Sequence, residues 1–372
     1  MVLYGQIVVG PPGAGKTTYC NGMQQYLRLI GREALVVNLD PANELLSSNE
    51  CNNNDDEKEN DEKNKILPYE TILDICEDVV NLSSVMDQLK LGPNGGLMYC
   101  MEYIERHLDH IIKLINERLP PPSSGGAYLL FDFPGQVELY THCTCVQNIV
   151  ARLQKELDLR LCAVQLVDSH YCTDATKFIS AALLSTTSML RLELPTVNIL
   201  SKIDLINQYG AIPYNLDFFT DCQDLNRLVS YVDSGADHFQ ESEEVYADDD
   251  EYQSARTRTK SSAFYKRHIR LHSQLCEVIE DFSLLNFLPL NISDAESVGR
   301  VVARIDKCNG YVFVASSSKN NQNSQRDVHD MFQCAMQMDN GWGYEQMTDI
   351  HERYLDLFKD NIDALNEKSK KK

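Results

Sequence analysis

The segment GPPGAGKTT at residues 10–18 contains the residue types and spacing with the clearest chemical meaning in this chain. Its pattern, G-x-x-x-x-G-K-[ST], is that of a loop whose backbone N–H groups turn toward a polyphosphate. Lys16 supplies a positive charge for the β- and γ-phosphates, and the Thr17 hydroxyl is suited to hold Mg²⁺. We therefore predict a nucleotide-binding loop that contains Gly13, Ala14, Gly15, Lys16, Thr17 and Thr18.

The segment DFPGQ at 132–136 fits the D-x-x-G arrangement of nucleotide switches. In that arrangement the aspartate, here Asp132, reaches Mg²⁺ through water, and the glycine N–H, here that of Gly135, meets the γ-phosphate. Gln136 stands where GTPases carry the glutamine that orients the attacking water. The alternative is that Gln136 and Glu138 are only the polar start of the next helix.

The segment SKID at 201–204 has a clear use in base recognition. Asp204 can accept two hydrogen bonds from the N1 and N2 donors of guanine, while the aliphatic stem of Lys202 lies over the base. Adenine offers no such pair of donors, so the segment favours GTP. Ser201 stands where the common GTPase pattern has Asn or Thr, and the last guanine-loop motif is not clear in this sequence.

These residues need a scaffold that brings them together, and the apolar runs predict one. GQIVVG before the phosphate loop is typical of a buried parallel strand, and TYCNGMQQYLRLIG after it is typical of a helix whose N-terminus faces the anion. Asp40, Asp132 and Asp168 each follow an apolar run, at the strand ends where open α/β sheets bind their ligands. We predict an α/β fold of the P-loop NTPase type, with a mostly parallel sheet flanked by helices. Further strands are expected at ALVVNL (34–39), AYLLFD (127–132), CAVQLVD (162–168), TVNILS (196–201) and FLPL (287–290).

The net charge of −21 limits the partners of this chain. Such a field repels nucleic acid and anionic membranes, so we expect direct contact with neither. The 12 cysteines lack C-x-x-C pairs, which suits reduced thiols in the cytoplasm. His142, Cys143 and Cys145 form the one cluster that resembles a metal site, but a packed helix start is favoured because a second pair of ligands is missing.

The segment LGPNGGL at 91–97 is a Gly/Pro/Asn turn that opens a long amphipathic pattern, LMYCMEYIERHLDHIIKLI. Taken alone, such a turn is usually structural. Together with GPPGAGKTT, NLDPAN, DFPGQVE and SKID, however, the triplet Gly92, Pro93 and Asn94 closely resembles that of the GPN-loop GTPases. LVDSHYCTDATKFIS at 166–180 looks like the type 2 subgroup of this family in particular.

The resemblance implies how the polar residues act. In this family two nucleotide sites face each other across a dimer, and the GPN turn of one subunit reaches toward the nucleotide of the other. Asn94 is therefore expected near the phosphate or the water of the partner's site. Asp40 is expected beside Mg²⁺ and the attacking water. The implied catalytic residues are Asp40, Asn94, Gln136 and Glu138, the implied metal-site residues are Thr17, Asp40 and Asp132, and the bound species are Mg²⁺ with GTP or GDP.

The resemblance covers nearly the whole chain to about residue 315 and defines the expected organisation. We predict a GPN-type GTPase domain at 1–315 and a polar, helical C-terminal tail at 316–372. An acidic, disordered insertion is expected at 49–65. A helical insertion is expected at 207–285, with a mobile acidic stretch at 235–262, because the distance to the last strand is too long for a simple crossover.

The cellular role also follows from the resemblance alone. It implies a slowly hydrolysing dimeric switch that assists RNA polymerase assembly and nuclear import, located in the cytoplasm with shuttling to the nucleus. The expected partners are a second copy or a GPN-loop paralogue, and RNA polymerase subunits or assembly factors. Leu216, Phe218 and Phe219 are candidates for a partner-binding groove, although burial in the core is favoured for each.

Two other functions stay open on the sequence alone. A P-loop small-molecule kinase would share the phosphate loop and the core, but it needs an arginine-rich substrate lid, which we do not find. A nucleotide-dependent scaffold without hydrolysis would bind GTP and dimerise. The presence of Asp40, Gln136 and Glu138 argues against this scaffold.

Overall fold

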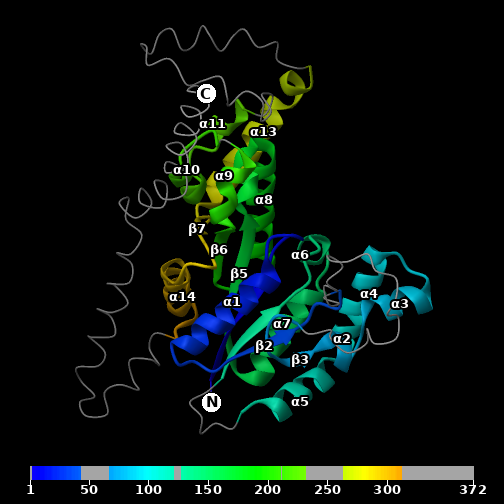
Figure 1. Ribbon diagram of the computed structural model, residues 1–372. Coiled ribbons are helices and arrows are strands. Elements are labelled where there is room, and N and C mark those ends of the chain that lie inside the picture. The colour runs from blue at the N-terminus through cyan, green and yellow to red at the C-terminus, as the bar shows by residue number, and fades with distance from the viewer. Residues whose placement is uncertain (1, 43–66, 121–126, 211, 232–262, 312–372) are drawn as a thin grey trace, which may run out of the picture. The chain divides into compact units, whose positions relative to one another are not determined.

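The computed structural model describes residues 2–42, 67–120, 127–210, 212–231 and 263–311 (Figure 1). These residues fall into two compact units, and each unit is described by itself. The first unit takes its described residues from 1–166, 188–197 and 292–331, and the second from 167–187 and 198–291. The predicted acidic insertion at 49–65, the acidic stretch at 235–262 and the tail at 316–372 lie outside the described residues.

Seven strands form a parallel sheet in the order β3-β2-β4-β1-β5-β6-β7. All six predicted strands are present, and the predicted α/β class is confirmed. β3 is the strand that the sequence analysis missed, because it is only four residues long and lies at the sheet edge. The strands are β1 (Leu3–Val9), β2 (Ala34–Asn38), β3 (Thr71–Asp74), β4 (Tyr128–Asp132), β5 (Leu159–Asp168), β6 (Thr196–Ser201) and β7 (Phe287–Pro289).

Helices connect these strands. In the first unit they are α1 (Lys16–Leu29), α2 (Ile75–Asp78), α3 (Leu82–Leu89), α4 (Pro93–Arg106), α5 (Leu108–Arg118), α6 (Glu138–Thr141), α7 (Cys145–Leu157) and α14 (Ala295–Asn309). α8 (Ala175–Leu192) begins in the second unit and ends in the first. The long amphipathic pattern after the GPN triplet is helical as predicted, but it divides into α4 and α5 at His107.

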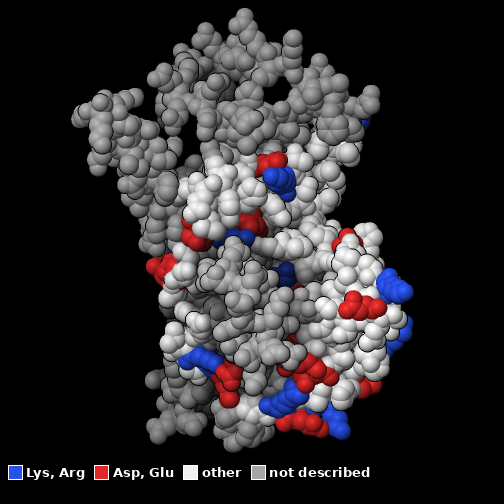
Figure 2. All heavy atoms as spheres, turned by 45° about the vertical axis from the view of Figure 1, so that its right-hand side comes forward, with Lys and Arg blue, Asp and Glu red and all other residues white. Residues whose placement is uncertain are grey.

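Charged side chains of both signs lie beside one another on the face of the molecule seen in Figure 2. On the described part of that face, no continuous basic area is present. None of the described helices combines the length and the apolar character that crossing a membrane requires.

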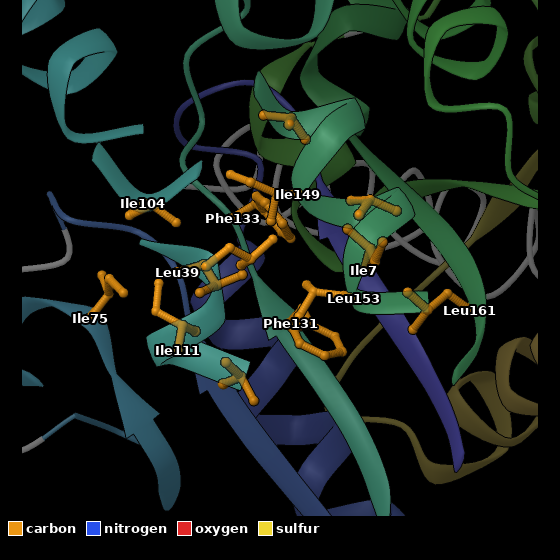
Figure 3. Packing of buried hydrophobic residues seen from close by; sticks show 14 of the residues in the cluster. Ile7, Leu39, Ile75, Ile104, Ile111, Phe131, Phe133, Ile149, Leu153 and Leu161 are labelled. Carbon is orange, nitrogen blue, oxygen red and sulfur yellow. The ribbon is translucent and has the colours of Figure 1, made fainter. Parts of the chain in front are cut away.

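The helices α4, α5 and α7 bury one face of the sheet in the first unit. Alternate strand residues point toward these helices, because successive side chains of a strand face opposite sides. Figure 3 shows this packing, in which the helix residues Ile104, Ile111, Ile149 and Leu153 meet the strand residues Ile7, Phe131 and Leu161. Burial of each large apolar side chain contributes about 1.5–3 kcal/mol, so this layer holds β1 and β4 rigidly beneath the loops that follow them.

The opposite face of the same strands carries a buried polar chain that joins α1 and α14 to the sheet. The Tyr19 hydroxyl of α1 donates to Gln6 Oε1 (2.9 Å), and Gln6 Nε2 donates to the Tyr128 hydroxyl (2.9 Å). Asn309, the last residue of α14, donates from Nδ2 to the same hydroxyl (3.3 Å). The helix that follows the phosphate loop is thus anchored to the sheet by packing and by hydrogen bonds.

The second unit contains four short helices and one long helix at its described positions between β6 and β7. They are η3 (Ile203–Leu205), α9 (Ile206–Tyr209), α10 (Leu216–Asp221), α11 (Asn226–Val229) and α13 (Ala263–Phe282), and η2 (Ser169–Thr173) follows β5. Leu216 is 1% exposed and Phe219 is fully buried, so these two side chains form core, as favoured over the groove. Phe218 is half-buried, with its ring stacked on Tyr214.

Candidate functional site

The phosphate loop connects β1 to α1 in the first unit. Gly13 and Gly15 have φ values of 80° and 89°, in the left-handed region that favours glycine, and Gly15 caps the helix. α1 begins at Lys16, so its first backbone N–H groups have no carbonyl partners within the helix and can bind an anion. The loop therefore has the backbone shape that its sequence pattern predicts.

Lys16 lies at the base of this loop. Its side chain is buried, and its Nζ donates to Gly10 O (3.2 Å) and Pro11 O (3.3 Å). Burial lowers the pKa of Lys16, while the negative charges of Asp132 and Asp40 oppose this shift. Thr17 is half-buried and Thr18 is exposed on the next two positions of α1.

Asp132 ends β4 directly beside the phosphate loop. Its Oδ2 accepts hydrogen bonds from the Thr17 hydroxyl (3.1 Å) and from the Tyr69 hydroxyl (2.9 Å). Its Oδ1 is buried without a hydrogen-bond partner among the described residues. Burial, and then the charge of Asp40, raise the pKa of Asp132 to about 6. A buried carboxylate oxygen without a hydrogen-bond donor is what a residue that faces a cation would show.

Asp40 lies in the loop after β2, where its own neighbours position it. Its N–H donates to Asn38 Oδ1 (3.1 Å), and its Oδ1 accepts from the Ala42 N–H (2.9 Å). Asn38 is held in turn, because its Nδ2 donates to Asp74 Oδ1 (2.9 Å). Burial raises the pKa of Asp40, so this second carboxylate also lacks full compensation of its charge.

Gly135 of the D-x-x-G segment lies close to the phosphate loop. A Cβ atom at this position would lie 2.5 Å from Lys16 Nζ and 3.1 Å from Pro12 Cα. Only a glycine fits there without displacing the lysine or the loop. The structure thus places Gly135 next to the phosphate loop, and its contact with a γ-phosphate stays a prediction.

Gln136 contacts the GPN triplet of its own chain. Its Nε2 donates to Asn94 Oδ1 (3.0 Å), while its Oε1 is buried without a hydrogen-bond partner among the described residues. Gly92 is the N-cap of α4 and Pro93 is its first residue, so the triplet starts the helix and is exposed. Glu138 is exposed at the start of α6, as the alternative interpretation of a polar helix start suggested.

The SKID segment lies in the second unit, at the end of β6. Ser201 is buried and its hydroxyl donates to Val167 O (3.1 Å). Lys202 has a φ of 57°, and its Nζ donates to Asp168 Oδ2 (2.7 Å). Asp204 is exposed in η3. Its carboxylate is therefore accessible to a base, as guanine recognition requires.

The comparisons with known proteins agree with this set of motifs. Residues 8–52 and 60–311 match a family model described as "Conserved hypothetical ATP binding protein". GPN-loop GTPase QQT1 of Arabidopsis thaliana is 41% identical over 355 residues, which cover 95% of this chain and 98% of the relative. GPN-loop GTPase 2 of Danio rerio is 41% identical over 363 residues, covering 97% and 95%. This chain belongs to the GPN-loop GTPase family.

The fold of this GPN-loop GTPase also has a solved counterpart. A GTPase in the apo form from Pyrococcus abyssi is similar with a TM-score of 0.50 and 19% identity, covering 82% of this chain and 97% of that structure. This likeness supports the fold alone. GPN-loop GTPase 2 of Saccharomyces cerevisiae is 38% identical over 313 residues, covering 84% of this chain and 76% of that protein. The predicted family, fold class and GTPase assignment are therefore confirmed.

Several site residues of this GPN-loop GTPase were not predicted. Tyr69 contacts Asp132 and Asp74 contacts Asn38, although neither belongs to a recognised motif. Only their position just before or within β3 could have indicated a role, and this strand was itself missed. In the His142, Cys143 and Cys145 cluster, His142 is the C-cap of α6 and Cys145 is the first residue of α7. Among the described residues no group of three or more metal-ligand side chains occurs.

Proposed function

We propose that this chain is a GTP-binding, slowly GTP-hydrolysing molecular switch that works as a dimer and uses Mg²⁺. One observation carries the metal and phosphate part of the proposal. The Thr17 hydroxyl and the Asp132 carboxylate meet at 3.1 Å, and the other oxygen of this carboxylate is buried without a partner among the described residues. Hydroxyl and carboxylate oxygens are the ligands that Mg²⁺ prefers, so the residues present fit this ion.

In this proposal the phosphate loop binds the triphosphate through the backbone N–H groups at the start of α1. The Lys16 ammonium compensates negative charge on the β- and γ-phosphates. Thr17, Asp132 and Asp40 would hold Mg²⁺, and the bound ion would supply positive charge against the charge that develops on the transferred phosphoryl group. Gly135 brings its backbone N–H close to the γ-phosphate, so this segment responds to the loss of that phosphate.

The attacking water is oriented by side chains that follow the strands. The buried Gln136 Oε1 is available to accept a hydrogen bond from this water, because its Nε2 is already bound to Asn94. Asp40 accepts a proton or a hydrogen bond from the attacking water. Glu138, at the exposed start of α6, also helps to orient this water. No arginine occurs in the GPN segment at 91–97, which fits slow intrinsic turnover.

The proposed cellular role rests on family resemblance. The switch would assist RNA polymerase assembly and nuclear import, pairing with a second copy or a GPN-loop paralogue and binding polymerase subunits or assembly factors. It would reside in the cytoplasm and shuttle to the nucleus. The net charge of −21 supports a protein partner over direct contact with nucleic acid.

The purified full chain should be titrated with fluorescent GTP and ATP analogues in Mg²⁺, with released phosphate and particle mass measured in parallel. We expect selective GTP binding, slow phosphate release and the mass of a dimer. Asp204→Asn should lose the selectivity, whereas Asp221→Asn, an exposed acid of the same unit, should retain it. Preference for ATP would agree with the family model's description and contradict the guanine assignment. Transfer to an acceptor would favour the kinase, and binding without phosphate release would favour the scaffold.

A further inference from the structure

Three consecutive residues at the end of β5 hold the first two residues of the SKID segment. Val167 O accepts from the Ser201 hydroxyl (3.1 Å), and Asp168 Oδ2 accepts from Lys202 Nζ (2.7 Å). The Ser169 hydroxyl donates to Lys202 O (2.9 Å). Lys202 is thus held at both its side-chain end and its backbone carbonyl by one short segment.

The ion pair between Asp168 and Lys202 is shielded from water. The side chains are 15% and 33% exposed, respectively. Partial burial lowers the pKa of Lys202, but the hydrogen bond and the charge of Asp168 outweigh burial and place this pKa above its ordinary value. A charge-assisted bond of this length restricts the four-carbon stem of the lysine much more than contact with solvent would.

The backbone at Lys202 also needs support from outside the segment. Its φ of 57° lies in the left-handed region, which a residue with a Cβ atom adopts only at a conformational cost. The Ser169 hydroxyl fixes the carbonyl of this residue, and the Leu205 N–H donates to the same carbonyl (3.0 Å). This conformation sets the direction in which the chain continues to Asp204, two residues later.

We propose that Asp168 and Ser169 are positioning residues for guanine recognition. Asp168 holds the Lys202 stem in the place where it lies over the base, and Ser169 holds the backbone turn that presents Asp204 to the base edge. The inference rests on the proposed GTP-binding function and adds a second segment to the guanine site. In sequence terms, the VDS triplet at 167–169 is part of base recognition although it lies more than thirty residues before SKID.

The test uses Asp168→Asn in the full chain. Asp168 Oδ1 also accepts from the His170 N–H (2.9 Å) and caps η2, and asparagine retains an oxygen for this cap. The substitution therefore removes the charge of the ion pair but keeps the cap. We expect the Kd for GDP to rise about tenfold, as for the loss of one charge-assisted hydrogen bond. Asp168→Glu should recover part of this loss, and Ser169→Ala should narrow the ratio between GDP and ADP affinity.

A double-variant cycle separates positioning from a general structural role. If Asp168 acts through Lys202, then Asp168→Asn should weaken GDP binding no further once Lys202→Gln is present. Asp174→Asn is the matched control. Asp174 caps the start of α8 and lies on the same segment, but its carboxylate pairs with the exposed Lys177. Melting temperatures of all variants verify that they are folded.

The outcomes distinguish this proposal from the function on which it rests. If Asp204→Asn lost guanine selectivity while Asp168→Asn and Ser169→Ala bound GDP like the wild type, the positioning role would be overturned and the guanine site would stand. Additive effects of Asp168→Asn and Lys202→Gln would overturn it as well. If Asp204→Asn bound guanine and adenine nucleotides like the wild type, both the guanine assignment and the positioning role would be wrong.

Discussion

Gln136 Nε2 and Asn94 Oδ1 are hydrogen-bonded within one chain, at 3.0 Å. The bond joins the D-x-x-G segment to the first turn of α4, so the GPN triplet contacts the predicted water-orienting residue of its own subunit. Family resemblance implies instead that Asn94 acts on the nucleotide of the partner. The two arrangements make different predictions for mixed subunits.

We predict that Asn94→Ala slows single-turnover GTP hydrolysis by roughly tenfold, because Gln136 loses the bond that orients its amide. Consider a dimer of one Asn94→Ala subunit and one Gln136→Leu subunit. If Asn94 acts with Gln136 of its own chain, each of the two sites lacks one of these residues and both are defective. If Asn94 acts on the site of the partner, one site has both residues intact. Recovery of about half of the wild-type rate in the purified heterodimer would therefore contradict action within one chain.

Gly135→Ala should abolish tight nucleotide binding. The added methyl group would lie 2.5 Å from Lys16 Nζ and would push this ammonium or the phosphate loop out of place. We expect the Kd for GTP to rise at least tenfold, measured by titration with a fluorescent analogue. Gly95→Ala is the control, since a Cβ atom there meets nothing within 4 Å. Equal affinities of the two variants would contradict the close approach of Gly135 to the loop.

Asp132→Asn should stabilise the nucleotide-free protein in EDTA while it weakens GTP binding. The folded-state pKa of Asp132, about 6, lies above its ordinary value of 3.8, so the folded state binds the proton more tightly than the unfolded state. The free energy of unfolding of the wild type therefore falls as pH rises from about 4 to about 6. At pH 7.5 the variant should gain about 2 to 3 kcal/mol.

Denaturant unfolding at two pH values checks this prediction. At pH 5.5 the advantage of the variant should be smaller by roughly 1 kcal/mol, because part of the wild-type carboxyl is then neutral. Mg²⁺ with GTP should reverse the order of stability at pH 7.5, since it binds the wild type better. If the stability advantage of the variant did not change with pH, the negative charge of Asp132 would already be compensated by its neighbours.

Asp306→Ala should destabilise the first unit without changing nucleotide affinity. Arg32 donates to both carboxylate oxygens of Asp306 (2.9 and 2.5 Å) and lies over the Tyr311 ring (4.2 Å). The two side chains of the ion pair are 15% and 8% exposed, so removal of one leaves a shielded, unpaired charge. We expect a loss of about 3 kcal/mol in the free energy of unfolding.

The control for this ion pair is Asp109→Ala, which removes one of the two acidic partners of Arg152 on the surface and leaves the other, Glu156, in place. Its cost should stay below about 1 kcal/mol, as for surface pairs. Denaturant unfolding of both variants measures the difference, and GTP titration checks that binding is retained. Equal costs would mean that burial of the Arg32–Asp306 pair does not determine its contribution.

Local patterns were sufficient to predict most of the elements that position the site. The phosphate loop was recognisable because its glycines and Lys16 are consecutive, and because an apolar strand and an amphipathic helix flank it. The strands that end at Asp132 and Ser201 were predicted for the same reason. β3 escaped prediction because a four-residue strand has too few positions to define a period, and Tyr69 escaped with it.

The amino-acid sequence by itself determined the family, the parallel sheet and the motifs from which phosphate and base contacts are proposed. Each of these depends on residues that are close together along the chain. Only the tertiary structure decided the pairs Gln136 with Asn94, Asp132 with Tyr69, and Lys202 with Asp168, whose members are separated by 42, 63 and 34 positions. Such pairs form because strand order and helix packing bring distant segments together, and no local pattern encodes that proximity.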